Sequence, residues 1–406
     1  MRILMLSEFY PPIVGGIQQH VQTLSIELAA RGHEVSVVTS WQEGLPKFEI
    51  DRGVRIHRIR GVVQRASILF SESERRYMPP FPDPGVMHAL RRIIQQERPE
   101  IVHAHDWTAY SFTLLKAWSK AKFIVSLHSY SHACVQKRMM QGENRCTGPG
   151  LMKCIKCATE FYGVVKGPVS TLSHGFWSKK ERHAVDMFLP VSRSVLEGNR
   201  LIAYKVPHRI IPNFIPDTSD IAINDTHPLL KELPEKDFLL FVGDVTLDKG
   251  VGVLLQAYAE MRIQIPLVII GRPTTDLPTK FPLTVFVTGK WPHEVVMSAW
   301  KRCIVGLAPS IWHDPCPTVA MEAMAMGKPV IASRIGGLSD IISDGETGIL
   351  VEPGNPEALG QAMQLLIDNP EQRKYMGTLA AQKVTEFQAK TVVSRIEEVY
   401  HDLLQA

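Results

Sequence analysis

Short apolar runs alternate with longer amphipathic segments along most of the chain. Runs long enough for buried strands are Arg2–Ser7, Glu34–Ser40, Val54–Ile59, Ile101–Ala104, Phe123–Leu127, Met187–Val191, Ile210–Ile211, Phe238–Val242, Leu267–Ile270, Leu283–Val287, Ile304–Ala308, Val330–Ala332 and Gly348–Val351. Helical spacing is found over Ile17–Arg31, Gly85–Glu97 and Thr108–Lys120, and in segments beginning near Lys249, Pro292, Thr318 and Pro356. This alternation favours an α/β fold with two doubly wound, Rossmann-like parallel sheets.

The 406 residues are too many for one compact core, and the pattern has a natural break. Residues 216–237 are rich in Asp, Pro, Asn and Thr and show no clear apolar period. We therefore expect one domain over 1–216 and a second over 217–385, joined by a hinge. Two open sheets joined in this way are expected to face one another across a cleft. The segments 61–84 and 129–185 fall outside the pattern.

Charge is distributed unevenly between the halves. Residues 1–216 carry 29 Lys and Arg against 17 Asp and Glu, whereas residues 217–406 carry 16 against 24. A basic first half suits an anionic acceptor, a membrane surface or nucleic acid, or it reflects only solvated faces. Arginines gather at positions 52, 55, 58, 60, 65, 75, 76, 91, 92 and 98. We expect no nucleic acid, because no nucleic-acid-binding motif appears in the sequence.

Targeting signals are not evident near the start of the sequence. The first apolar run, Ile3–Leu6, is broken by Ser7 and Glu8. Nowhere does an apolar run reach the ~18 residues that cross a bilayer. We therefore expect a cytoplasmic location, with peripheral association at the inner face of the membrane as a further expectation from the basic first half.

Glycine-containing loops follow the first predicted strand of each half. Gly15 and Gly16 precede a helix, where a backbone without Cβ atoms can approach a phosphate or a sugar. Gly243 follows a strand, and Lys249 comes just before the next helix. Both loops are candidates for binding a nucleotide, although turn glycines and a solvated lysine are the simpler alternatives.

A sharper signal follows the strand Ile304–Ala308. Pro317, Thr318 and Val319 would form a first helical turn with free amides directed at an anion. Glu322, one turn further on an otherwise apolar face, needs a partner when buried, and a ribose diol, a structural arginine or a backbone cap would serve. Asp314 lies on the preceding loop.

Four of the six cysteines lie within one short segment. Cys154 and Cys157 form a CxxC pair, and Cys134 and Cys146 precede it. In a reducing compartment a structural four-thiolate zinc site fits this set, with an iron–sulfur cluster and free or disulfide-bonded thiols as alternatives. Histidines 103, 105, 128, 132 and 174 suggest a metal centre only if the fold brings them together, and scattered polar cleft residues are the simpler interpretation.

These motifs together resemble family 4 retaining glycosyltransferases of the GT-B architecture over nearly the whole chain. The segments that carry the resemblance are Gly15–Gly16, Arg31–Val35, Ile101–Asp106, Ser126–His128, Val191–Ser192, Ile211–Asn213, Val242–Gly243, Lys249–Gly250, Asp314–Glu322, Gly327–Val330 and Ile335–Gly337. The resemblance also implies that a C-terminal helix, residues 386–406, packs back on the first domain.

The resemblance assigns roles residue by residue. Glu322 matches the carboxylate that binds the ribose, and Asp314 stands where the family usually has a Glu that contacts the donor sugar. Lys249 matches the lysine that holds the donor diphosphate, His128 the histidine near the donor sugar, and Gly16 the glycine whose amide approaches the phosphates.

One position departs from the family pattern. The usual companion of the lysine is an arginine, and Asp244 occupies its place. Arg272, after the strand Leu267–Ile270, is a candidate to supply that charge from a neighbouring loop.

The reaction implied is retaining transfer of a sugar from a nucleoside diphosphate sugar to a lipid-linked or polysaccharide acceptor. No catalytic metal is expected, because a cation, a helix N-terminus and amides can stabilise the departing diphosphate. The alternatives are a catalytically silent module that binds a sugar nucleotide or a protein, a structural subunit at membranes, and a hydrolase using paired carboxylates such as Glu8 and Asp106.

Overall fold

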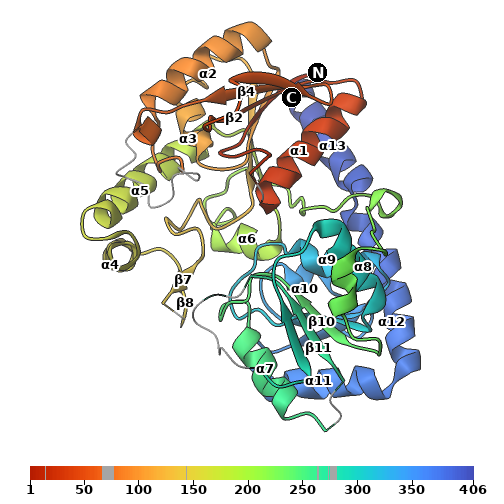
Figure 1. The fold of residues 1–406 in the computed structure, drawn as a ribbon. Helices are drawn as coiled ribbons and strands as arrows, with labels where there is room; N and C mark the ends of the chain where they lie inside the picture. The colour runs from red at the N-terminus through yellow and green to blue at the C-terminus, as the bar shows by residue number, and fades with distance from the viewer. Residues whose placement is uncertain (14, 66–76, 143, 263–264, 273, 275–280) are drawn as a thin grey trace. The chain divides into compact units, whose positions relative to one another are not determined.

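The computed structural model describes residues 1–13, 15–65, 77–142, 144–262, 265–272, 274 and 281–406. The chain forms two compact units, shown in Figure 1. Unit 1 comprises Met1–Pro212 and Val392–Ala406, and unit 2 comprises Asn213–Thr391. The polar stretch 216–237, expected to be a hinge without regular structure, contains two short 3-10 helices, η3 (Thr218–Asp220) and η4 (Pro228–Glu232).

Unit 1 contains a seven-stranded sheet with the order β3-β4-β2-β1-β5-β6-β9. Its strands are β1 (Arg2–Leu6), β2 (Glu34–Ser40), β3 (Phe48–Asp51), β4 (Val54–Ile59), β5 (Ile101–Ala104), β6 (Lys122–Leu127) and β9 (Met187–Pro190). All neighbours pair in parallel except β3, which pairs antiparallel with β4. The parallel sheet was predicted, and its central strands are buried on both faces, as their continuous apolar runs indicate.

Two sequence expectations for this sheet were wrong. The edge strand β3 was missed because it is half-exposed and short, with no continuous apolar run. Ile210–Ile211 is not a strand. Pro212 follows directly and lacks the N–H that would extend a ladder, although the Ile211 amide still donates to the carbonyl of Pro190 at 3.1 Å.

In the described part of residues 1–212, seven helices lie between or after these strands. They are α1 (Gly16–Ala30), η1 (Val63–Arg65), α2 (Pro84–Glu97), α3 (Thr108–Thr113), α4 (Leu151–Tyr162), α5 (Lys166–Ala184) and α6 (Arg193–Gly198). The helix predicted over Thr108–Lys120 ends at Thr113. The amides of Leu115 and Trp118 donate to carbonyls three residues back, so the segment tightens into turns.

The segment 129–185, which lacks the strand and helix pattern in the sequence, is ordered. It holds the hairpin of β7 (Met140–Gln141) and β8 (Asn144–Arg145), followed by α4 and α5, which pack against each other. Of the other unusual segment, 61–84, residues 66–76 lie outside the described residues, and with them Arg75 and Arg76 of the basic cluster.

Unit 2 contains a six-stranded parallel sheet with the order β12-β11-β10-β13-β14-β15. Its strands are β10 (Leu239–Val242), β11 (Leu267–Ile270), β12 (Val285–Thr288), β13 (Val305–Ala308), β14 (Val330–Ser333) and β15 (Gly348–Val351). Alternate residues such as Leu239 and Phe241 enter one core with helices α7 and α11, while Leu240 is buried on the opposite face. The sheet is therefore covered on both faces, as predicted.

The helices of unit 2 are α7 (Val251–Ala259), α8 (His293–Arg302), α9 (Thr318–Ala325), α10 (Leu338–Ile341), α11 (Pro356–Asp368), α12 (Pro370–Lys383) and η5 (Val384–Phe387). On one face α7 packs against α11. On the other, a Cβ atom placed on Gly306 of β13 would lie 3.1 Å from both Ala323 of α9 and Trp300 of α8. A glycine in this strand lets two helices approach the sheet closely.

The last helix, α13 (Ala389–Gln405), belongs mostly to unit 1. Arg31 and Glu397 form an ion pair at 3.0 Å, and His33 contacts the same carboxylate at 2.7 Å. Figure 1 shows α13 running beside α1. Deeper in the core, the hydroxyl of Tyr400 lies 2.6 Å from Nδ1 of His103 on β5, and both side chains are fully buried.

A search of the described helices finds none long and apolar enough to span a membrane.

We expect Tyr400→Phe to lower the free energy of unfolding of unit 1 by about 1–3 kcal/mol, because His103 would lose a buried hydrogen-bond partner. Tyr375→Phe, at a side chain that is 65% exposed, is the matched control and should have no measurable effect. Urea unfolding of both variants tests this. Equal stability of the two variants would contradict the buried hydrogen bond.

Candidate functional site

The strand order of each sheet reverses at one point, and ligands of open α/β sheets bind beside such points. In unit 2, β10 lies between β11 and β13, so the loops that follow β10 and β13 leave the sheet in different directions. In unit 1, β1 lies between β2 and β5. Most of the predicted site residues follow β1, β10 or β13 in the sequence, whereas Arg272 follows β11 and His128 follows β6.

In unit 2, the loops after β10 and β13 touch through their backbones. Gly250, with φ of +78°, precedes α7, and a Cβ atom there would lie 1.8 Å from the carbonyl oxygen of Pro309. The Ile311 amide also donates to the carbonyl of Asp248 at 2.9 Å. Only glycine fits at position 250, so this contact fixes the backbone that carries Lys249.

The loop after β14 supports the same region from the other side. Gly337 donates its amide to the carbonyl of Asp314 at 2.8 Å. A Cβ atom on Gly336, whose φ is +62°, would lie 2.3 Å from that carbonyl oxygen. Three loops at the carboxyl ends of β10, β13 and β14 therefore form one rigid surface.

The surface carries an ion pair between two of the predicted residues. The ammonium group of Lys249 contacts Oδ2 of Asp314, and the two side chains are 30% and 10% exposed. The same ammonium group lies 5.6 Å from the centre of the Trp312 ring. Lys249 is thus accessible, with its charge balanced by a nearly buried carboxylate.

Asp314 leads directly into α9. Pro317 at the N-cap is extended and makes no side-chain capping bond, so the first amides of α9, at Thr318 and Val319, are not capped by that residue. One turn further, Oε1 of Glu322 lies 3.2 Å from Nε2 of His293 at the start of α8. This hydrogen bond raises the pKa of His293 above its usual value, with burial acting in the opposite direction.

The partner of Glu322 was not predicted. His293 begins α8, a few residues after the end of β12. Its position shortly after a strand end was the signal in the sequence that could have made it a candidate site residue. The sequence interpretation considered only a ribose, an arginine or a backbone cap. The structure shows instead an imidazole that is 48% exposed.

The remaining candidates of unit 2 lie on neighbouring loops. Gly243 has φ of +147°, and a Cβ atom on Gly271 would lie 1.7 Å from its carbonyl oxygen, so the loops after β10 and β11 also touch. Arg272 is exposed, and its carbonyl accepts the amide of Val245 at 3.0 Å. Asp244 is exposed.

In unit 1, the predicted glycines lie at the start of α1. Gly15 is its N-cap, in extended conformation, and Gly16 is its first residue. No side chain caps this helix at Gly15, which leaves the amides of its first turn without that partner.

His128, after β6, belongs to a buried histidine cluster. Its Nε2 atom lies 3.0 Å from Nδ1 of His105, and ligand atoms of these two residues and His20 all lie within 4.8 Å of one another. Burial, followed by the neighbouring imidazoles, lowers the pKa of His105 well below its usual value and that of His103 to about 3. Burial likewise lowers the pKa of His20 well below its usual value, so His20, His103 and His105 are neutral at pH 7. Ring contacts and a hydrogen bond join these residues and His128.

Two carboxyl groups nearby are engaged by backbone amides. Glu8 accepts from the amide of Met78, and Asp106 accepts from the amide of Glu8. Burial raises the pKa of Glu8 to about 7, opposed by Lys137, whose ammonium group lies 3.8 Å away. These contacts give both carboxyl groups a structural role.

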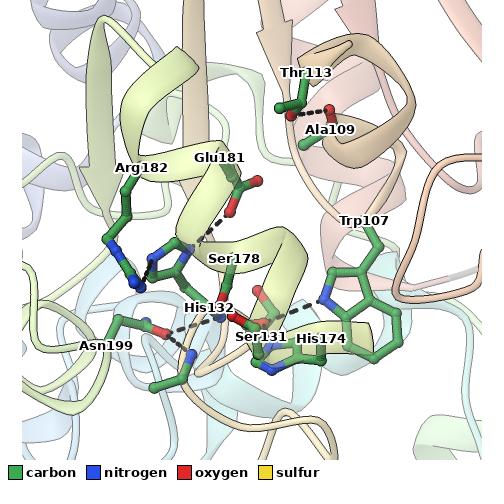
Figure 2. A network of polar contacts seen from close by, with 12 residues as sticks. Trp107, Ala109, Thr113, Ser131, His132, His174, Ser178, Glu181, Arg182 and Asn199 are labelled. Carbon is green, nitrogen blue, oxygen red and sulfur yellow. Dashed lines mark hydrogen bonds and ion pairs between the residues drawn. The ribbon is translucent and has the colours of Figure 1, made fainter. Parts of the chain in front are cut away.

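A polar network holds the loop that follows His128, as Figure 2 shows. The side-chain oxygen of Asn199 accepts the amides of His132 and Ala133 at 3.0 and 3.1 Å. Nδ1 of His132 lies 2.7 Å from Glu181, and Arg182 contacts the other ring nitrogen at 3.4 Å. Sequence reasoning missed Asn199, Glu181 and Arg182, because their partners are distant in the chain.

The same network reaches the neighbouring residue of the loop. The carbonyl of Ser131 accepts from the Trp107 indole at 3.2 Å and lies 2.7 Å from Nε2 of His174. Backbone groups on both sides of Ser131 are thereby fixed by α3, α5 and α6. The loop starting at His128 is consequently well positioned.

The four cysteines of the predicted metal site lie near one another, but their sulfur atoms are not gathered closely enough to surround one ion. Charges on the other three contribute, after burial, to raising the pKa of Cys157. Among the described residues, however, no group of three cysteines has its sulfur atoms within 4.8 Å of one another. The thiol of Cys146 donates instead to the carbonyl oxygen of Gly148, with an S···O distance of 3.5 Å. The thiol of Cys157 donates to the carbonyl oxygen of Met140 at 3.8 Å.

Solved structures share this architecture along the whole chain. Sucrose-phosphate synthase from Thermosynechococcus elongatus matches with a TM-score of 0.74 and 20% identity, covering 99% of both chains. Anabaena Alr3699/HepE, solved in complex with UDP-glucose, matches with a TM-score of 0.68 and 14% identity, covering 98% of this chain and 99% of that one. The fold is therefore that of the GT-B glycosyltransferases.

Sequence comparison identifies the family. Residues 14–219 match the model described as "Glycosyltransferase Family 4", and residues 225–383 match "Glycosyl transferases group 1". The chain belongs to glycosyltransferase family 4. Glycogen synthase of Mycobacterium tuberculosis is 26% identical over 434 residues, covering 98% of this chain and 94% of that protein. D-inositol 3-phosphate glycosyltransferase of Corynebacterium diphtheriae is 33% identical over 180 residues, covering 40% and 42%.

The neutral histidines of unit 1 predict a loss of stability in acid. The pKa values of His20 and His105 lie well below the usual value, those of His103 and His174 are lowered to about 3 and about 4, and burial is the main cause in each case. Below pH ~6.5 the unfolded chain binds protons that the folded chain excludes, so each group removes up to about 1.4 kcal/mol per pH unit. Glu8 acts oppositely between pH ~4.5 and 7, since only its folded form is then protonated.

Calorimetry between pH 8 and 5 at constant ionic strength is the measurement. The four histidines outweigh the two carboxyl groups whose pKa values burial raises, Glu8 and Asp106. The unfolding temperature of unit 1 should therefore be constant above pH ~7 and fall steadily below pH ~6.5. A constant unfolding temperature down to pH 5 would show that these imidazoles are solvated.

Proposed function

We propose that this chain is a retaining glycosyltransferase that transfers a sugar from a nucleoside diphosphate sugar to a lipid-linked or polysaccharide acceptor. The observation that carries the proposal is the joint surface of Lys249, Asp314 and the start of α9, built by loops at the switch point of the second sheet. Glycogen synthase, sucrose-phosphate synthase and a HepE–UDP-glucose complex among the similar proteins support the donor class.

In this proposal the diphosphate binds at Lys249 and at the amides of Thr318 and Val319. A cation and a helix N-terminus together favour a doubly charged anion, because both act on the same oxygen atoms. Glu322 accepts the ribose hydroxyls in place of its contact with His293. Gly243 allows the close approach of the donor, and Arg272 supplies a second positive charge from the next loop.

The ion pair between Lys249 and Asp314 links two steps of donor recognition in this proposal. When a diphosphate binds, the ammonium group is shared with phosphate oxygens, and Asp314 is released to accept hydroxyls of the donor sugar. One contact thus links recognition of the nucleotide to recognition of the sugar.

Catalysis follows from stabilising the leaving group. Positive charge and amide donors at the diphosphate lower the barrier to breaking the glycosidic bond without a carboxylate nucleophile. The proposed retention of configuration then comes from attack on the same face as the leaving diphosphate, whose oxygen accepts the proton of the acceptor. The structural engagement of Glu8 and Asp106 is consistent with this route.

For unit 1 we propose acceptor binding and a cytoplasmic, membrane-peripheral location. Gly15 and Gly16 offer amides of the first turn of α1. His128, positioned by the network of Figure 2, keeps the role beside the donor sugar that the family pattern gives it. The excess of positive charge on residues 1–216 favours an anionic acceptor or surface.

Calorimetric titration with UDP, GDP and ADP, followed by assays of donor hydrolysis, tests the proposal. We expect one nucleotide to bind, with Lys249→Ala and Glu322→Gln each weakening binding by roughly tenfold or more through loss of a charged hydrogen bond. The matched control is Lys301→Ala, because that lysine forms an exposed ion pair with Asp225. Turnover should be lost in both site variants and kept in the control.

The alternatives give different results. Nucleotide binding without turnover on a wide acceptor panel would indicate a silent module. No nucleotide affinity in the folded protein would exclude the donor site altogether. Binding that is unchanged in Glu322→Gln would remove the proposed ribose contact.

We also propose a structural metal ion, zinc or an iron–sulfur cluster, at Cys134, Cys146, Cys154 and Cys157. Supporting it, Cys154 and Cys157 accept N–H groups of Gly150 and Gln136 at 3.3 and 3.1 Å, as metal-bound thiolates commonly do. The segment would have to close around the ion. Elemental analysis should find about one equivalent of zinc, or about two or four of iron, per chain. The metal should be lost in Cys154→Ser and kept in the control Cys303→Ser. Metal-free, fully folded protein would contradict this.

A further inference from the structure

Helix α5 exposes an apolar row on its surface. Val165, Val169, Leu172 and Phe176 are 73%, 57%, 56% and 55% exposed. Their spacing of four, three and four residues places them on one side of a helix. We refer to these four residues as the α5 stripe.

The opposite side of α5 is buried and polar. Its buried residues are Gly167, Thr171, His174, Ser178 and Glu181. His174 and Glu181 belong to the network that holds the loop after His128 (Figure 2). The helix therefore has the reverse of the usual amphipathic arrangement, with polar groups inside and apolar groups outside. Such an arrangement calls for an apolar environment on the outer side.

The exposed apolar surface extends beyond α5. Val164, next to the stripe at the α4–α5 turn, is 79% exposed, and Phe161 on α4 is 55% exposed. At the start of α4, Leu151 and Met152 are 62% and 76% exposed. Monomeric proteins rarely expose this many neighbouring apolar side chains without a binding role.

Positive charges border this surface. Lys166 begins α5, and Lys179 and Lys180 follow Phe176 by one turn. These three and Lys156 are exposed, and the ammonium group of Lys180 lies 5.7 Å from the Phe176 ring centre. Long lysine side chains can keep their charge in the headgroup region while apolar neighbours enter deeper.

We propose that the α5 stripe docks unit 1 onto an anionic phospholipid surface, with α5 lying in the plane of the membrane. Apolar side chains beside lysines match the acyl boundary and the phosphates of such a surface. A symmetric pair of chains is disfavoured, since it would place the same lysines of both copies against each other. The inference rests on the membrane-peripheral location proposed above and names the surface that makes the contact, and docking itself requires no sugar nucleotide.

Sedimentation with vesicles tests the proposal. Full-length protein should bind equimolar phosphatidylcholine–phosphatidylglycerol vesicles and bind phosphatidylcholine vesicles much less. Leu172→Glu/Phe176→Glu should abolish binding, and Lys179→Gln/Lys180→Gln should weaken it roughly thirtyfold, given the contribution of each lysine at an anionic surface. Leu365→Glu/Tyr375→Glu, at exposed apolar positions of unit 2, is the matched control and should bind normally.

Light scattering on the same proteins distinguishes membrane docking from self-association of the chain through the α5 stripe. A dimeric wild type that becomes monomeric in Leu172→Glu/Phe176→Glu, without vesicle binding, would overturn the proposal in favour of self-association. Equal binding to neutral vesicles, or binding retained by the stripe variant, would overturn it as well. Circular dichroism checks that each variant is folded. Nucleotide titration of the stripe variant should be unchanged, which distinguishes failure of docking from failure of the donor site.

Discussion

Direct contact between backbone segments is the constraint on which the second unit's site depends. At Gly250 and Gly336 the neighbouring carbonyl oxygens leave no space for a Cβ atom, and both residues have positive φ. The loops that follow three parallel strands therefore contact one another and form one surface. On this surface the ammonium group of Lys249 meets the carboxylate of Asp314, and no long flexible segment is needed to hold them. The positions of these two charged groups are therefore fixed mainly by contacts between backbone segments, and the side chains add only the ion pair itself.

The parallel sheets were predictable because strands buried on both faces must be apolar throughout, and such runs are visible in the sequence. The edge strand β3 and the last residues expected of α3 were not. β3 is half-exposed, and the turn after Thr113 depends on local hydrogen bonds to carbonyls three residues back. Helix α5 was missed because its burial pattern is inverted, so the usual relation between apolar spacing and the core does not hold. Helix α4 was missed as well, and Ala158 is its buried residue.

Candidate site residues in unit 2 were predicted from their positions after strands and before helices, and the ion pair of Lys249 with Asp314 joins two of them. His293 and Asn199 illustrate the limit. Each acts through a partner 29 or 67 residues away, respectively Glu322 and the amide of His132, and neither has a local motif. Hydrogen bonds between distant segments become visible only when the fold has brought the segments together.

The path of α13 has a consequence for how the protein is made. Residues 392–406 complete unit 1, yet all of unit 2 lies between them and Pro212 in the chain. During synthesis the ribosome therefore releases the whole second unit before His103 can meet Tyr400. Part of the core of the first unit therefore stays uncovered until the last helix has been synthesised, whereas all residues of the second unit are available earlier.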